Sequence, residues 1–433
     1  MEVKPGRLRA TGRLAPCIIL MLGCGSERGA VDAGTSAADG VLSEAGDDAA
    51  SPARPEARTG LTSGSACDAS AQCLSGACTL GACSDWPHAM RIRIDTTAAG
   101  ADIREAVVDF PLLLRLDATS FPFAEARHDG ADIRFVDASG QTLSHEVERW
   151  DGDSGVAALW VLVPRIEGDS RNNSVLMYWG NPLAAPTSSG PSVFGAFACV
   201  LHMSGAPDGV ASHLGDSSGR GNIGLVQNPT ADALPADGLA GLGLALDGTS
   251  TYVATNVAST SPPQVFSVSL WLKTTSSTRA GIAGFASNPS GSDVTFDRAI
   301  EMDESGRLAF AVLPGGHLLT ISTLTGYNDG AWHLVVARLS SRGQYLFVDG
   351  EPVADDPTSS AADPHNGYWR FGEEPLTSPA PATTDAALPA GNFFSGTLDE
   401  IRVTTDEPSD ARIKLAYATQ RPGTTAVSYQ PVP

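Results

Sequence analysis

One short pair of carboxylates has the spacing that hydrolytic chemistry uses. Glu301 and Asp303 stand two residues apart in the run Glu-Met-Asp. Alternate residues of a β-strand face the same side, so such a pair could flank a glycosidic bond. The next position in phase is Ser305, and Glu304 faces the opposite side, so no third acid continues the row. With no serine-hydrolase or histidine-rich metal motif in its place, we predict no catalytic residues and no enzyme activity.

A second acidic group invites the same interpretation. Glu146, Glu148 and Asp151 fall within six residues. Paired acids act on a glycoside only across a cleft of set width, which a sequence cannot supply. We therefore favour a solvated strand face that ends in the Asp151-Gly152 turn.

Four cysteines form a third cluster of residues that could do chemistry. A segment this short, rich in Ser, Gly and Ala, has no core of its own, so in an exported chain it is expected to hold two disulfides. A zinc site is the alternative, but no Cys-x-x-Cys pair occurs and the nearest histidine is His88. Three pairings remain open. The cysteines are Cys67, Cys73, Cys78 and Cys83. A lone Cys199 in an apolar strand is expected to be a buried small hydrophobe.

The length, net charge and composition of the chain limit its domain number, its partners and its fold class. With 433 residues we expect two or more domains, and a net charge of −21 argues against a nucleic-acid partner. The chain has 46 Gly and 29 Pro, which favours many turns and few long helices. An all-β fold is predicted.

The N-terminus has the pattern of an export signal. Basic residues precede the apolar run Leu14 to Leu22, which is too short to span a bilayer as a helix, and Gly23-Cys24 follows. This resembles the bacterial lipobox, although Met21 stands where leucine is preferred. The resemblance implies a signal peptide over 1–23 and a lipidated Cys24. An ordinary secretory signal is the alternative.

The residues after Cys24 lack large apolar side chains. Residues 24–66 cannot bury enough surface to offset chain entropy, so we expect a disordered acidic tether. The expected order continues with a cysteine-rich knot at 67–85. A lipid at Cys24 would hold the protein at the bacterial cell envelope, exposed at the outer membrane or cell surface, with no other membrane contact.

Residues 86–191 show the short alternating strands of a β-sandwich. Met90, Ile92 and Ile94 point one way along the first strand. The motifs Ala-Asp-Ile-Arg-Phe-Val-Asp at 131–137 and Met-Tyr-Trp-Gly-Asn-Pro at 177–182 resemble the bacterial domain of unknown function 2341. That resemblance implies a fold and a neighbouring LamG-like module, but no activity.

Residues 192–433 contain a hairpin signature. Trp332 to Leu339 forms one apolar strand, Ser340 to Gly343 a loop, and Tyr345 to Val348 the returning strand before Asp349-Gly350. This resembles the LamG-like, concanavalin A-like lectin/glucanase jelly roll. Val268, Leu270 and Leu272 mark another half-buried strand. A helix behind the N-cap Ser409 is expected to close the domain.

The resemblance also implies sites. Many such jelly rolls carry structural calcium, which would here use Asp399 and Asp216 with loop carbonyls. The alternative is that Asp399 caps a strand edge or pairs with Arg402. For a sugar, the best aromatic cluster is Tyr368 and Trp369, although alternation puts at least one face of that strand in the core.

We therefore expect a surface-tethered, non-catalytic binding or adhesion module. Its partner would be a polysaccharide, an envelope or matrix component, or a surface protein. A glycoside hydrolase of the concanavalin A-like class is the alternative, because this fold serves both roles.

Overall fold

The computed structural model describes residues 63, 65–68, 72, 78–80, 82–204, 213–229, 235–260, 262–291, 295–374 and 392–432. All of these belong to one compact unit, Arg58–Pro433. The expected signal peptide 1–23, the lipidation site Cys24 and most of the expected tether lie outside the described residues. Within the part of the chain that is described, no helix combines the length and apolar character needed to cross a membrane.

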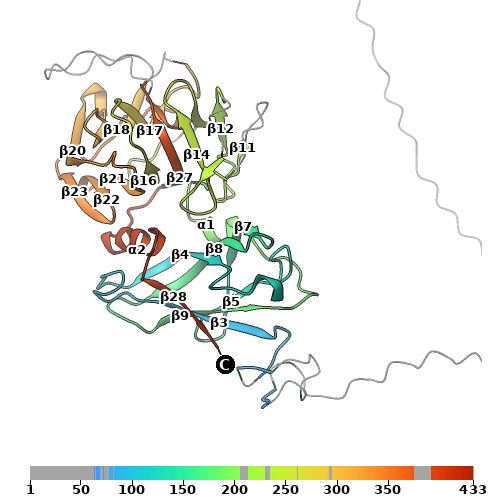
Figure 1. The fold of residues 1–433 in the computed structure, drawn as a ribbon. Helices are drawn as coiled ribbons and strands as arrows, with labels where there is room; N and C mark the ends of the chain where they lie inside the picture. The colour runs from blue at the N-terminus through green and yellow to red at the C-terminus, as the bar shows by residue number, and fades with distance from the viewer. Residues whose placement is uncertain are drawn as a thin grey trace, which may run out of the picture. The chain divides into compact units, whose positions relative to one another are not determined.

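The first domain is a β-sandwich, as predicted (Figure 1). One antiparallel sheet has the order β28-β3-β9-β5-β6, and the other has the order β4-β8-β7. Met90, Ile92 and Ile94 point into the core between them. The strands are β3 (His88–Ile94), β4 (Val107–Asp117), β5 (Arg134–Val136), β6 (Thr142–Leu143), β7 (His145–Asp151), β8 (Val156–Ile166), β9 (Asn173–Trp179) and β28 (Val427–Pro431), with the 3-10 turn η2 (Phe123–Glu125).

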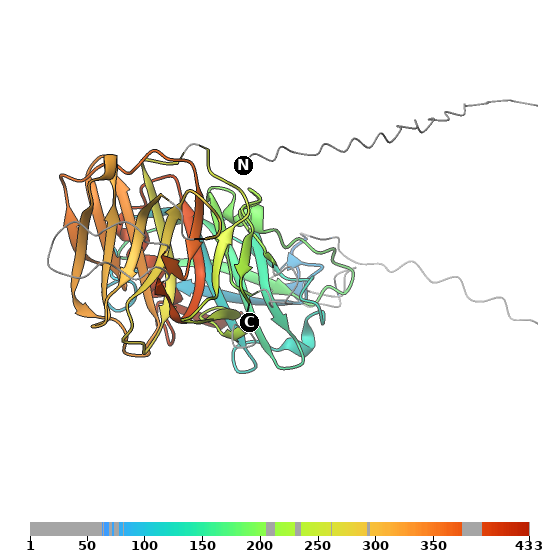
Figure 2. The same cartoon turned by 90° about the horizontal axis from the view of Figure 1, so that it is seen from above.

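The second domain is the predicted jelly roll of two antiparallel sheets, seen from above in Figure 2. Sheet A runs β13-β14-β27-β16-β21-β22-β23, with β10 also paired to β27. Its strands are β10 (Cys199–Leu201), β13 (Pro235–Asp237), β14 (Leu242–Asp247), β16 (Phe266–Lys273), β21 (His333–Ser340), β22 (Gly343–Val348), β23 (Glu351–Asp356) and β27 (Ser395–Thr404).

Sheet B runs β11-β12-β15-β24-β17-β18-β19-β20. Its strands are β11 (His213–Leu214), β12 (Gly224–Gln227), β15 (Tyr252–Thr255), β17 (Ala280–Ala286), β18 (Phe296–Met302), β19 (Arg307–Val312), β20 (Leu319–Gly326) and β24 (Tyr368–Phe371). Smaller elements are β25 (Glu373–Glu374) with β26 (Asn392–Phe393), the turn η3 (Pro314–Gly316) and the helix α1 (Gly190–Phe194).

The predicted hairpin is confirmed in sheet A. Strands β21 and β22 pair from Val335↔Val348 to Ser340↔Gly343. The next turn begins at Asp349, with φ of 54°, and Gly350, with φ of 85°. Positive φ at both central residues suits a tight hairpin turn, which explains the Asp-Gly pair there.

The predicted helix is also confirmed, as α2 (Asp410–Gln420). The Ser409 side chain accepts a hydrogen bond from the Arg412 amide, so Ser409 is the N-cap.

The helix covers Trp271, whose face of β16 is opposite the core residues Val268, Leu270 and Leu272. The Trp271 ring stacks on Tyr417 at 5.9 Å between centroids. Both faces of β16 are therefore buried.

The C-terminal boundary differs from the expected jelly roll at 192–433. Strand β28 pairs with β3 of the first sandwich, with Tyr429 opposite Ile92. In Figure 1 the C-terminus accordingly lies beside β3 and β9. Leu415 and Ala418 of α2 also pack into the core of the first domain. The chain thus leaves the sandwich, builds the jelly roll and returns, because β3 offers an edge that β28 fills.

The cysteine-rich segment holds a disulfide between Cys67 and Cys78. Strand β1 (Cys78–Thr79) pairs with β2 (Ala82–Cys83). Cys83 is also disulfide-bonded, while Cys73 lies outside the described residues. Cys199 is free and buried, as expected for a small hydrophobe.

Candidate functional site

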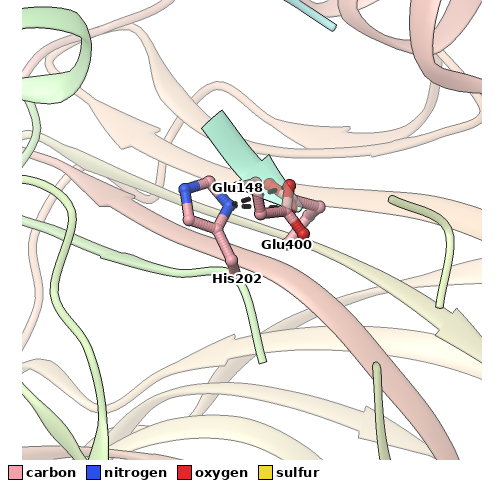
Figure 3. Close-up of side chains that lie close together, drawn as sticks. All are labelled: Glu148, His202 and Glu400. Carbon is pink, nitrogen blue, oxygen red and sulfur yellow. Dashed lines mark hydrogen bonds and ion pairs between the residues drawn. The ribbon is translucent and has the colours of Figure 1, made fainter. Parts of the chain in front are cut away.

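Three side chains from distant parts of the sequence meet where β7, β10 and β27 approach one another (Figure 3). Glu148 belongs to β7, His202 follows β10, and Glu400 belongs to β27. The pairing Leu201↔Ile401 brings His202 beside Glu400. We call Glu148, His202 and Glu400 the Glu-His-Glu cluster.

Two β-bulges turn the acids toward His202. Val147 pairs with Leu159 and Arg149 with Ala158, so Glu148 is an extra residue in β7. In the same way, Asp399 pairs with Trp271 and Arg402 with Ser269, which leaves an extra residue in β27. Glu400 there has φ of 52°, a region that a glutamate occupies only at a cost. Bulges of this kind redirect a side chain out of the strand's alternation.

The imidazole of His202 is held by three carboxylates. Its Nδ1 donates to Glu400 Oε1 at 2.8 Å and lies 3.7 Å from Glu148 Oε2. Its Nε2 lies 3.4 Å from Glu146 Oε2. Both ring nitrogens of His202 therefore face negative charge.

Each carboxylate has a second partner. The Trp160 indole donates to Glu148 Oε2 at 2.8 Å, and Arg402 donates to Glu400 Oε2 at 2.7 Å. The Ser217 hydroxyl donates to Glu146 Oε1 at 2.7 Å. These contacts fix the orientation of all three acids.

Aromatic rings enclose the cluster. Trp160 stacks on His202 with centroids 5.8 Å apart, and Phe194 meets the same ring edge-on at 5.3 Å. The Arg402 guanidinium lies 4.3 Å from the Trp160 ring centroid. The apolar cluster that contains Trp160 and Phe194 also includes Val200 and Ala240, so it joins the sandwich to the jelly roll.

Burial and charge set the protonation of the cluster. Side-chain exposure is 6% for His202 and 1% for both Glu148 and Glu400. Burial opposes charge on His202, but Glu400 and Glu148 outweigh it and raise the pKa of His202 well above its usual value. Burial opposes charge on Glu400 too, yet His202 and Arg402 lower its pKa. Burial, with repulsion from Glu400, raises the pKa of Glu148. Without another cation, these directions favour a charged His202 beside a charged Glu400, and a neutral Glu148.

Three of these groups also have atoms that hydrogen-bond to nothing in the described part of the molecule. They are Glu146 Oε2, Glu148 Oε1 and His202 Nε2, and Arg402 Nε is a fourth nearby. Buried polar atoms in native proteins normally have partners, so this concentration is unusual. The arrangement can hold a cation or an ion pair, but it has no exposed carboxylate to offer a substrate.

The interpretation of Glu146 and Glu148 as a solvated face is wrong. Glu148 is enclosed, and Glu146 has only 13% of its side chain exposed. Glu146 and Glu148, two acids in phase on one strand, were the sequence signal that could have indicated this site. The sequence could not add His202 and Glu400, because long-range pairing brings them there.

The residues expected to bind calcium are engaged by the backbone. The Asp399 carboxylate accepts the amides of Leu239, Ala240 and Glu400. The Asp216 carboxylate accepts the amides of Val200, Ser218 and Asn222. These amides compete with a calcium ion for the carboxylate oxygens. Of the alternative roles for Asp399, capping of backbone amides is observed. The pairing with Arg402 is not, because Arg402 pairs with Glu400.

The expected aromatic platform is not available at Trp369. This side chain is 7% exposed and packs against Phe285 and Phe266, at 5.1 and 6.0 Å between centroids. Tyr368 faces the other way and is half-buried. Alternation along β24 places Trp369 in the core, because Phe371 is on the same face.

The two acids in phase, Glu301 in β18 and Asp303 just after it, both form ion pairs. Glu301 forms an ion pair with Arg279 at 2.9 Å. Asp303 pairs with Arg307 at 2.6 Å and also accepts backbone amides of its turn. Each carboxylate is therefore held by an arginine.

Comparison with known families agrees with this architecture. Residues 129–199 match the domain of unknown function DUF2341, and residues 247–414 match the concanavalin A-like lectin/glucanases superfamily. The chain joins these two domains in that order. No curated protein sequence matches it.

The solved structures that are similar to this chain match only part of it. The receptor-binding domain of botulinum neurotoxin C/D mosaic serotype is 14% identical, with a TM-score of 0.36 and 51% of each chain covered. The binding domain of botulinum neurotoxin DC in complex with SialylT is 11% identical, with a TM-score of 0.34 and 52% of each chain covered. Trypanosoma rangeli sialidase is 10% identical, with a TM-score of 0.36, and the match covers 66% of this chain and 46% of that one. The chain spans about half the length of these structures.

Proposed function

We propose that this protein is a non-catalytic carbohydrate-binding module that a lipid at Cys24 tethers to the bacterial cell surface. The match of residues 247–414 to the concanavalin A-like lectin/glucanases supports a carbohydrate ligand. That superfamily name covers both binding and hydrolysis, so the fold alone does not choose between them.

One observation favours binding over hydrolysis. Glu301 and Asp303, the acids in phase near the end of β18, each form an ion pair with an arginine. A glycosidase needs two carboxyl groups that are free to flank the scissile bond, and here each acid is engaged by a guanidinium. The Glu-His-Glu cluster cannot replace this pair, because its side chains are enclosed.

The outer face of sheet B is the surface that we assign to the ligand. Glu301, Ala309 and Ser322 stand in register across β18, β19 and β20, opposite the core residues Ile300, Phe310 and Ile321. Ser322 is exposed. Small side chains leave room for a sugar, while a carboxylate and hydroxyls can bind its hydroxyl groups.

The test is a glycan and envelope-polysaccharide binding screen with the mature chain, paired with a reducing-end assay on every polymer that binds. We expect binding without release of reducing ends. Glu301→Gln should weaken binding, whereas Glu304→Gln, an exposed acid in the following turn, should not. Release of reducing ends would reverse the assignment to hydrolysis, and failure to bind any polymer would leave an envelope or matrix role without a sugar ligand.

A further inference from the structure

We propose that Glu148, His202 and Glu400 bind one divalent transition-metal ion, and that this ion links the sandwich to the jelly roll. Zinc is the ion used to test the site. The candidate ligand atoms all lie within 4.8 Å of one another. Figure 3 shows one ring nitrogen of His202 joined by dashed lines to the carboxylates of Glu148 and Glu400. The ligands come from both domains, so a bound ion would link them.

The spacing suits a small ion. Zinc binds imidazole nitrogen and carboxylate oxygen at about 2.0–2.2 Å, which in a tetrahedral site puts neighbouring ligand atoms roughly 3.3–3.6 Å apart. His202 Nδ1 lies 2.8 Å from Glu400 Oε1 and 3.7 Å from Glu148 Oε2. These two distances bracket the required value, so small side-chain movements would admit the ion.

The surroundings match the outer shell of a metal site. A histidine ligand normally directs its second ring nitrogen to a carboxylate, which orients the ring. Here His202 Nε2 lies 3.4 Å from Glu146 Oε2, and Ser217 orients Glu146 in turn. Arg402 likewise holds the outer oxygen of Glu400, and Trp160 donates to Glu148 Oε2, the oxygen that lies 3.7 Å from His202 Nδ1.

An unused ligand atom is an independent sign of a missing partner. Glu148 Oε1 makes no hydrogen bond within the described residues, although its side chain is 1% exposed. The glycine at 241 brings the chain close to this atom, since a Cβ there would lie 2.5 Å from it. With both oxygens of Glu148 on the ion, the three side chains would supply four ligand atoms.

One divalent cation would also balance the buried charge. With a neutral imidazole and ionised acids, the four carboxylates outnumber the two guanidinium groups by two, and buried charges need compensation. These carboxylates are Glu146, Glu148, Asp399 and Glu400, and the guanidinium groups are those of Arg115 and Arg402.

The donor set indicates which ion. Calcium takes six to eight oxygen ligands and magnesium keeps several waters, whereas an imidazole with two carboxylates in an enclosed site suits zinc, manganese or iron. The site is thus distinct in position and chemistry from the calcium expected at Asp399 and Asp216.

In the competing description, protons and not a metal ion neutralise the charge of the same cluster. In it, His202 is an imidazolium, Glu148 is a neutral acid, and no metal binds. Glu148→Gln separates the two descriptions. Glutamine resembles the protonated acid and keeps an oxygen for Trp160, but it removes a negatively charged ligand.

The experiment uses the mature chain without a polyhistidine tag, refolded with zinc or with cobalt(II) and then dialysed. Metal content comes from elemental mass spectrometry, cobalt coordination from visible absorption, and thermal stability from melting with metal or chelator. We expect one equivalent of metal and a melting temperature that zinc raises and a chelator lowers. Calcium should have no such effect.

Variants locate the ion. Glu148→Gln should lose the bound metal, and Glu146→Gln should weaken binding about 10–100-fold while still folding. Glu125→Gln is the matched control, because Glu125 pairs with His88 at 3.3 Å on an exposed surface. Wild-type protein that refolds without zinc or cobalt and melts identically with metal and chelator would overturn the proposal. Equal metal content in Glu146→Gln, Glu148→Gln and wild type would overturn it as well.

Discussion

His202 Nδ1 lies 2.8 Å from Glu400 Oε1, although 198 residues separate the two in the sequence. The pairing of β10 with β27 makes this contact, and Glu148 from the first sandwich completes it. The described part of the chain therefore places buried charge where its two domains meet.

Breaking this buried pair should cost far more than breaking an exposed one. Glu400→Gln leaves His202 and Arg402 facing a neutral amide, and loss of one partner of a buried pair typically costs about 3–5 kcal/mol. Urea unfolding in the presence of chelator measures this loss without a metal contribution. Glu167→Gln, which removes an exposed pair with Arg165, is the control and should change little. Similar midpoints for the two variants would contradict the prediction.

His145 should make the first domain sensitive to acid. Burial, with a smaller effect of Arg134, lowers the pKa of His145 from 6.5 to about 4. The unfolded chain therefore binds the proton more readily, so stability is full above pH 6.5 and declines as pH falls toward 4. The loss attributable to His145 should reach about 3 kcal/mol. Unfolding at several pH values for wild type and His145→Gln gives the difference in slope. Parallel pH profiles would exclude a buried, neutral His145.

Tyr429 should stabilise the returning C-terminal strand. Its hydroxyl donates to the Arg115 carbonyl at 2.8 Å, and its body packs against the first-domain core. Tyr429→Phe should cost about 1 kcal/mol, the usual net value of one hydrogen bond. Denaturant unfolding measures it, and Ser428→Ala, at an exposed neighbouring position, should be neutral. A neutral Tyr429→Phe would mean that this bond adds nothing beyond strand pairing.

The lipid anchor is tested at the expected junction Gly23-Cys24. Cys24→Ala should abolish labelling with a fatty acid and shift the protein to the aqueous phase on detergent partition. Two acyl chains give stable attachment where a single chain does not, so the shift should be nearly complete. Membrane retention equal to that of wild type would exclude this anchor and leave the ordinary secretory signal.

Local patterns in the sequence determined most of the fold. Alternation identified the core faces of β3 and β16, turn residues fixed the hairpin of β21 and β22, and Ser409 marked the start of α2. The cysteine spacing predicted disulfides but not the pairing of Cys67 with Cys78. These features depend on neighbours a few residues apart, which is why they can be read directly.

The tertiary structure alone decided which polar faces are covered. Alternation gave Glu148 an outward face but could not show that a bulge and a second domain would enclose it. The same holds for the return of β28 to β3 and for the joining of His202 to Glu400. An extra residue in a strand shifts the phase of its side chains, and burial depends on segments hundreds of residues away. Neither effect leaves a local pattern, so only the folded chain brings the Glu-His-Glu cluster together.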